Sequence, residues 1–239
     1  MVPDRAQPWK HKDKAWSQRA PNGPWDYVVV GSGIGGMTAA ALLAESGRRV
    51  LVLEQHYVPG GFTHAFRRPG YSWDVGVHAV GEVSERSLPG RVLARLTHGR
   101  LAWASLGKVY DEFHFPGDFR IDFPDNPGAF RENLVAAFPA ETAAIDRYLA
   151  LLREVANSMK GYYAARTLPA SVAPVADRLL ARRAQGFLAE RTADVVGRLT
   201  ADPRLRATLT AQWGYYGSVP SRSSFAIQAL VVQHFKWGA

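Results

Sequence analysis

The chain has 239 residues, of which 47% are hydrophobic and 21% are charged, and its formal net charge is +8. This composition is that of an ordinary globular protein, and the length allows one or two domains. The absence of cysteine excludes disulfides, thiolate metal sites and a cysteine nucleophile. The positive charge is spread along the chain rather than gathered in blocks, so we expect no nucleic-acid partner.

Residues 1–24 are predicted to form a flexible basic arm. This segment carries Lys10, Lys12, Lys14 and Arg19 together with four prolines, and its only large apolar groups are Trp9 and Trp16, which is typical of a solvated tail. The alternative is a peripheral contact with an anionic membrane surface. No segment has the charged, apolar and small-residue regions of a secretory signal in that order. We therefore expect a cytoplasmic protein, and the alternative is a cytoplasmic protein that associates peripherally with a membrane.

A glycine-rich turn follows at residues 26–36, which read DYVVVGSGIGG. Residues 27–30 are apolar and mostly β-branched, which is typical of a parallel strand buried on both faces. Gly31, Gly33 and Gly36 then have the G-x-G-x-x-G spacing. Gly31 would permit the tight turn, Gly33 would let a pyrophosphate approach the backbone, and Gly36 would let the next helix pack on the sheet.

The context of this turn is more specific than the glycines alone. A helix is expected over residues 35–46, with its N-terminal amides directed at the phosphates. Residues 49–53 supply a second strand, and Glu54 ends it where an acid can accept hydrogen bonds from the ribose hydroxyls. Strand, turn, helix, strand and acid in this order predict a dinucleotide-binding site.

A second glycine pair, Gly60-Gly61, follows the ribose acid closely. Amides that are exposed without Cβ atoms can contact another part of an extended cofactor. On spacing alone, a Pro-Gly-Gly turn without any ligand is an equally good interpretation.

Three segments resemble the flavoprotein family of phytoene desaturases, carotenoid isomerases and retinol saturases: GSGIGGMTAAALLAESGRRVLVLEQHYVPGGFTHAF, GYSWDVGVHAVGEV at residues 70–83, and WGYYGSVPSRSSF at residues 213–225. They are most similar to the retinol saturase and carotenoid isomerase branch. The resemblance implies an α/β fold, with an incomplete Rossmann-like FAD-binding domain over residues 25–106. A mostly helical substrate or cap region that contains a β-hairpin would occupy residues 107–239.

The resemblance also implies FAD as the cofactor, with NAD(P)H as a candidate electron donor. Adenosine would lie on Glu54, and the segment around Asp74, Gly76 and His78 would lie near the ribityl chain and flavin. We interpret Asp74 and His78 as binding residues, predict no catalytic residue, and find no metal-ligand spacing among the histidines. The cofactor-binding candidates are Gly31, Ser32, Gly33, Ile34, Gly35, Gly36, Glu54, Gln55, Gly60, Gly61, Asp74, Gly76 and His78.

The remainder of the chain predicts a hairpin and then helices. Residues 109–115 and 119–123 alternate between apolar and polar side chains, which indicates a β-hairpin with one apolar face. Asp111 breaks this alternation, so we expect an exposed hairpin end. From residue 141 to Met159 the apolar residues recur at helical spacing. Other helical patterns lie within residues 88–106, 176–183, 187–199, 203–213 and 223–234.

These features predict an FAD-dependent oxidoreductase, or the N-terminal part of one, acting on an apolar carotenoid- or retinoid-like polyene by saturation, desaturation or flavin-assisted isomerisation. The late aromatic residues as a group suit a tunnel for a polyene, although helix packing explains each one singly. They are Tyr162, Tyr163, Phe187, Trp213, Tyr215, Tyr216, Phe225, Phe235 and Trp237. No segment returns to complete the sheet, so we expect a closing C-terminal half to be missing. The alternatives are a non-catalytic remnant that keeps the nucleotide pocket and an NAD-binding dehydrogenase.

Overall fold

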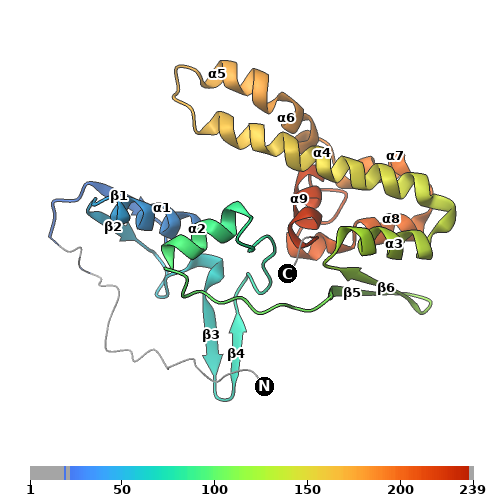
Figure 1. The fold of residues 1–239 in the computed structure, drawn as a ribbon, viewed down its shortest axis with the longest axis horizontal. Helices are drawn as coiled ribbons and strands as arrows, with labels where there is room; N and C mark the ends of the chain where they lie inside the picture. The colour runs from blue at the N-terminus through green and yellow to red at the C-terminus, as the bar shows by residue number, and fades with distance from the viewer. Residues whose placement is uncertain (1–18, 20–21, 237–239) are drawn as a thin grey trace. The chain divides into compact units, whose positions relative to one another are not determined.

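The computed structural model describes residue 19 and residues 22–236, and these divide into two units, Met1–Val77 and His78–Ala239 (Figure 1). The expected basic arm, residues 1–24, lies almost entirely outside the described residues. The expected boundary after residue 106 stays a prediction, although packing groups residues 78–106 with the second unit.

The first unit begins with the strand–helix–strand order that the sequence predicts. Strand β1 (Tyr27–Val30) pairs in parallel with β2 (Val50–Leu53), and helix α1 (Ile34–Glu45) connects them. Tyr27 lies opposite Val50 and Val30 opposite Leu53. The carboxyl ends of both strands therefore lie at the same edge, where the glycine turn and Glu54 follow.

The expected burial of β1 on both faces is wrong. Val28 is 54% exposed and Val30 is 83% exposed. Within the described residues the sheet contains just β1 and β2, so few side chains are available to cover it. The β-branched run therefore identified the strand correctly but overstated how much of it this chain buries.

The first unit also contains a β-hairpin that was not anticipated from the sequence. Strands β3 (Ala65–Arg68) and β4 (Tyr71–Asp74) pair antiparallel around Pro69-Gly70, and Gly70 has a φ of +80°. The rings of Phe66 and Trp73 stack across the pair with centroids 5.3 Å apart.

Helix α2 (Leu88–Leu96) in the second unit is shorter than the pattern within residues 88–106. The Ser87 hydroxyl accepts from the Gly90 amide at 3.0 Å and caps its start. His98 and Gly99 have φ values of +52° and +70°, and this left-handed backbone ends the helix.

The predicted hairpin is confirmed as β5 (Val109–Phe115) and β6 (Phe119–Pro124), but its beginning differs from expectation. A register shift lies between Val109 and Asp111, and it lets Tyr110 pack against the core. Asp111 is half-buried rather than at an exposed end. The bulge therefore explains why the alternation breaks at Asp111, because the extra residue lets Tyr110 face the core.

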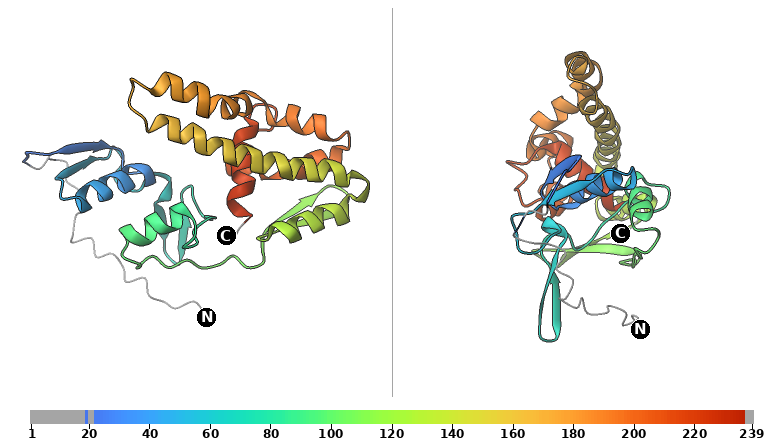
Figure 2. Two further views of the ribbon diagram at one scale, coloured as in Figure 1. Left: turned by 45° about the horizontal axis from the view of Figure 1, so that its top comes forward. Right: turned by 90° about the vertical axis from the view of Figure 1, so that its left-hand side faces the viewer.

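In the described part of the second unit, the helices α3 to α9 follow the hairpin, and all of them except α5 contribute to one core. Ala176 of α5 packs in a second, smaller cluster with Ala165 and Ala181. The longest helix, α4, runs beside α6 and against α9 (Figures 1 and 2). The apolar spacing expected up to Met159 is confirmed, since Ile145, Tyr148 and Leu152 are buried on one face of α4. The helices are α3 (Pro127–Ala137), α4 (Thr142–Arg166), α5 (Ala173–Ala176), α6 (Arg182–Ala189), α7 (Thr192–Leu199), α8 (Pro203–Leu209) and α9 (Phe225–Phe235).

The later helices are interrupted more often than the sequence patterns suggest. A π-helical turn, Asp177–Ala181, joins α5 to α6 within the segment expected at residues 176–183. The helix expected over 187–199 is broken where the Phe225 amide donates to the Glu190 carbonyl at 2.8 Å. None of the helices in the described residues has both the length and the apolarity to cross a membrane.

Candidate dinucleotide-binding site

The glycine turn has the close backbone approach that its spacing predicts. Gly31 adopts a φ of +94°, a conformation that favours glycine. A Cβ on Gly36 would lie 2.1 Å from the Gly31 carbonyl oxygen and 3.4 Å from Val29. Gly36 therefore allows α1 to start directly beside the end of β1.

At Gly33 the position that a Cβ would occupy is open space. Gly33 is the residue before α1 and has an ordinary φ of −63°, and no atom lies within 4 Å of the position its Cβ would take. No described side chain caps this helix start. The first amides of α1 and the open space at Gly33 together fit a phosphate, because uncapped helix N-termini bind anions.

Glu54 lies directly beside this turn. Its Oε2 accepts from the Ser32 amide at 2.8 Å and from the Ser32 hydroxyl at 2.5 Å, and its Oε1 accepts from the His56 amide at 2.8 Å. These hydrogen bonds, led by the Ser32 hydroxyl, lower the pKa of Glu54 to about 2. The group is thus a fixed carboxylate, and its oxygens have further lone pairs for ligand hydroxyls.

Ser32 also ties the second glycine pair to the first. Its hydroxyl accepts from the Gly60 amide at 2.9 Å. Gly61 has a φ of +57°, and a Cβ there would lie 3.0 Å from the Gly33 Cα. Two loops that are far apart in the sequence therefore meet with backbone against backbone, which leaves amides rather than side chains around Gly33.

Gly76 joins the same group of residues. The Val75 amide donates to the His64 carbonyl at 3.1 Å, and the Val77 amide donates to the Phe62 carbonyl at 3.0 Å. A Cβ on Gly76 would lie 2.8 Å from the Phe62 Cβ. Glycine at this position lets residues 75–77 run close beside the loop that carries Gly60-Gly61.

The other candidates are not gathered at the turn. Asp74 is exposed at the end of β4, where it lies opposite Ala65, and Gln55 is exposed after Glu54. His78 is the first residue of the second unit, where its ring stacks on Tyr215 with centroids 6.2 Å apart. The structure thus brings together the glycine, Ser32 and Glu54 candidates, and their role toward a cofactor stays a prediction.

Sequence reasoning did not anticipate the interaction between Asp111 and Tyr215. The Tyr215 hydroxyl donates to Asp111 Oδ2 at 3.0 Å. Burial raises the pKa of Asp111, and burial together with the Asp111 charge raises the pKa of Tyr215. The break in alternation at Asp111 was the available signal. Among the described residues, no group of histidine, aspartate and glutamate could hold a metal ion.

Comparison with known proteins supports this geometry. Residues 29–95 match the family model of an NAD(P)-binding Rossmann-like domain. The whole chain is 36% identical to the human (Homo sapiens) all-trans-retinol 13,14-reductase, and 56% of it is 33% identical to prolycopene isomerase 1 from an Oncidium hybrid cultivar. The chain is a homologue of the retinol reductases and carotenoid isomerases. It spans 40% of the human relative and 23% of the Oncidium one.

Solved structures agree with this fold. Putrescine oxidase, solved with putrescine in a study of cofactor binding, superposes with a TM-score of 0.54 at 16% identity. The match covers 88% of this chain and 42% of the oxidase. At this identity the likeness shows the Rossmann-like α/β fold and nothing of the substrate.

Proposed function

We propose that this chain is the nucleotide-binding part of an FAD-dependent oxidoreductase that acts on an apolar polyene of the retinoid or carotenoid type. The observation that carries the proposal is the Glu54 carboxylate, fixed by Ser32 at the start of the uncapped helix α1. The substrate class is supported by the relatives, which are a reductase of all-trans-retinol and an isomerase of prolycopene.

Each group of the turn has a role in this proposal. The amides that begin α1 bind the diphosphate, and Gly33 leaves room for it. Glu54 accepts hydrogen bonds from the ribose hydroxyls and repels a 2′-phosphate. The Gly60 amide is bonded to Ser32, so the Gly61 backbone is the part of this loop that faces the more distant part of the cofactor. FAD, once bound, supplies the hydride or electron transfer at the conjugated double bond.

Titration of the purified chain with FAD tests the proposal. We expect a shift in flavin absorbance and a change in its fluorescence on binding, and competition by ADP, which shares the adenosine diphosphate half. Flavin spectra identical to those of free FAD at saturating protein would contradict it. NADH in the same competition separates an FAD protein from an NAD-binding dehydrogenase, because Glu54 suits both.

The proposal also covers the flavin end of the cofactor, the electron donor, the substrate region and localisation. Asp74 and His78 are proposed to approach the flavin end, NAD(P)H is proposed as the electron donor, and the second unit is proposed to supply the substrate region. Peripheral membrane association of a cytoplasmic protein stays a prediction, because the cations that suggest it lie mostly outside the described residues. Retention of bound FAD without any redox turnover would favour the non-catalytic alternative.

A further inference from the structure

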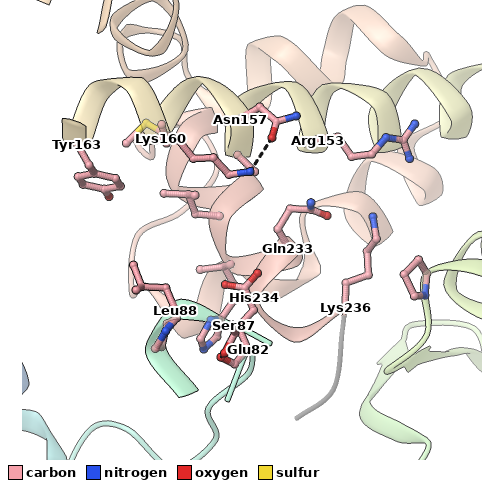
Figure 3. A pocket seen from close by; sticks show the side chains of 16 residues that line it. Glu82, Ser87, Leu88, Arg153, Asn157, Lys160, Tyr163, Gln233, His234 and Lys236 are labelled. Carbon is pink, nitrogen blue, oxygen red and sulfur yellow. Dashed lines mark hydrogen bonds between the residues drawn. The ribbon is translucent and has the colours of Figure 1, made fainter. Parts of the chain in front are cut away.

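The second unit contains a cavity of about 960 Å³, which is within the size range of small-molecule sites (Figure 3). It is lined by residues from the start of α2, from α4 and from α9. One part of the lining is apolar and includes Leu88, Met159, Tyr163 and Leu230. Of the late aromatic residues in the described part of the chain, Tyr163 lines this cavity.

Three cations also line the cavity: Arg153 and Lys160 from α4, and Lys236 from the end of α9. Among the described residues that line the cavity, Glu82 is the one with a carboxylate. Figure 3 shows Glu82 beside Ser87 and His234, whereas Lys236 points toward α4. The cavity is therefore positively charged at the side where α9 faces α4.

Lys236 is the unusual member of this group. Its side chain is 3% exposed, and it makes no hydrogen bond or ion pair with any of the described residues. Burial and the nearby charge of Arg153 lower the pKa of Lys236 to about 8. The Lys236 ammonium keeps some accessible surface, since it is not among the fully buried atoms without a partner, and it lines the cavity. A largely buried ammonium is normally paired, because an uncompensated charge there is costly.

The neighbouring groups leave this charge uncompensated. Asp146, one of the two acids of α4, already binds Arg131 through both oxygens at 2.6 and 2.9 Å. Glu154, which directly follows Arg153, accepts from Arg183 at 2.9 and 2.6 Å. Lys160 donates to Asn157 at 3.0 Å. The Gln233 side chain, which also lines the cavity, is an uncharged amide and supplies no counter-charge.

We propose that this cavity binds an apolar molecule with a carboxylate headgroup, which Lys236 and Arg153 hold while the apolar lining contacts its chain. A carboxylate would provide the missing counter-charge for both cations. An anion without an apolar chain would leave the rest of the lining unused, and an uncharged alcohol would leave the cations unpaired. The inference goes beyond the proposed redox function and does not depend on FAD.

Isothermal titration of the full chain with decanoate, decanol and inorganic phosphate tests this inference. We expect decanoate to bind about tenfold or more tightly than decanol, because a charge-assisted hydrogen bond is lost in the alcohol. Phosphate should bind weakly. Equal affinity for decanoate and decanol, or binding of phosphate as tight as that of decanoate, would overturn the proposal.

Variants locate the binding within the cavity. Lys236→Met should weaken decanoate binding about tenfold or more and leave decanol binding unchanged. Arg153→Gln changes an exposed side chain and serves if Lys236→Met fails to fold. Lys108→Met, at an exposed lysine that does not line the cavity, is the matched control and should bind normally. Normal decanoate binding by both cavity variants would refute the assignment.

Discussion

Glu54 is the side chain on which the proposed nucleotide binding most depends, because its carboxylate is held at the turn by hydrogen bonds from the Ser32 and His56 amides. Glu54→Gln keeps the size of the side chain but removes the charge. Hydrogen bonds to a charged group contribute about 1.5–3 kcal/mol, so we expect roughly 10- to 150-fold weaker FAD binding. A flavin fluorescence titration measures it, and an unchanged dissociation constant would show that Glu54 does not contact the ribose.

The titration of Glu54 provides an independent prediction. The folded-state pKa is lowered from 4.5 to about 2, so this group stabilises the first unit above pH 4.5 and the contribution is lost as the pH falls through 2. Carboxyl-detected NMR should give a midpoint of about 2. Ser32→Ala removes the largest cause and should raise the midpoint toward 4.5, whereas Ser46→Ala should leave it in place. A wild-type midpoint near 4.5 would refute the Ser32 contact.

Substitutions at Gly33 and Gly36 distinguish an effect on FAD binding from an effect on folding. Gly33→Ala places a methyl group in open space, so stability should not fall, while FAD binding should weaken by about 1–3 kcal/mol through steric conflict with the phosphate. Gly36→Ala forces a Cβ against the Gly31 carbonyl and should destabilise the first unit itself. Gly186→Ala, also in a helix and with nothing nearby, is the control. Equal FAD affinity of Gly33→Ala and wild type would argue against the phosphate position.

At the scale of single elements, local sequence signals set the start of helix α3. The Asn126 side chain accepts from the Gly128 and Ala129 amides at 2.9 and 3.1 Å, and Pro127 occupies the first turn. Asn126→Ala should lower the free energy of unfolding by about 0.5–2 kcal/mol. Asn126→Asp keeps an acceptor and should lose little. Chemical denaturation measures both, and similar losses in the two variants would exclude the capping role.

Several elements were readable from the sequence and some were overlooked. The Asn126-Pro127 start of α3 and the Pro69-Gly70 turn between β3 and β4 are visible as local signals, so those omissions were avoidable. The π-helical turn is different. A Cβ on Gly161 would lie 2.5 Å from the Leu180 carbonyl, so the turn packs tightly on α4. Such an interruption depends on tertiary contact, which periodicity does not encode.

The core of the second unit depends on the buried face of α4. Leu152 is fully buried, whereas Leu179 is 75% exposed. Leu152→Ala should destabilise this unit by about 2–5 kcal/mol because it leaves a cavity. Leu179→Ala should change stability by less than about 0.5 kcal/mol. Urea denaturation followed by circular dichroism gives both values, and comparable losses would contradict the burial pattern.

At the scale of the whole molecule, the sequence predicted the conformation of the glycine turn better than it predicted which segments pack around the turn. Glycine spacing and Glu54 follow local backbone rules, so their meeting could be anticipated. The exposure of Val30 and the contact of His78 with Tyr215 depend on which segments pack nearby, and a local pattern does not specify them. The hydrogen bonds of Ser32 to both Glu54 and Gly60 likewise required the folded structure.

The central claim is that a cofactor diphosphate binds at the first amides of α1, beside Glu54. Amide-resolved NMR during titration with FAD measures this directly. We predict the largest shifts at Gly31, Ser32, Gly33 and Ile34, with smaller shifts at Gly60 and Gly61. Shifts confined to other parts of the chain, with the amides of this turn unchanged at saturation, would contradict the account.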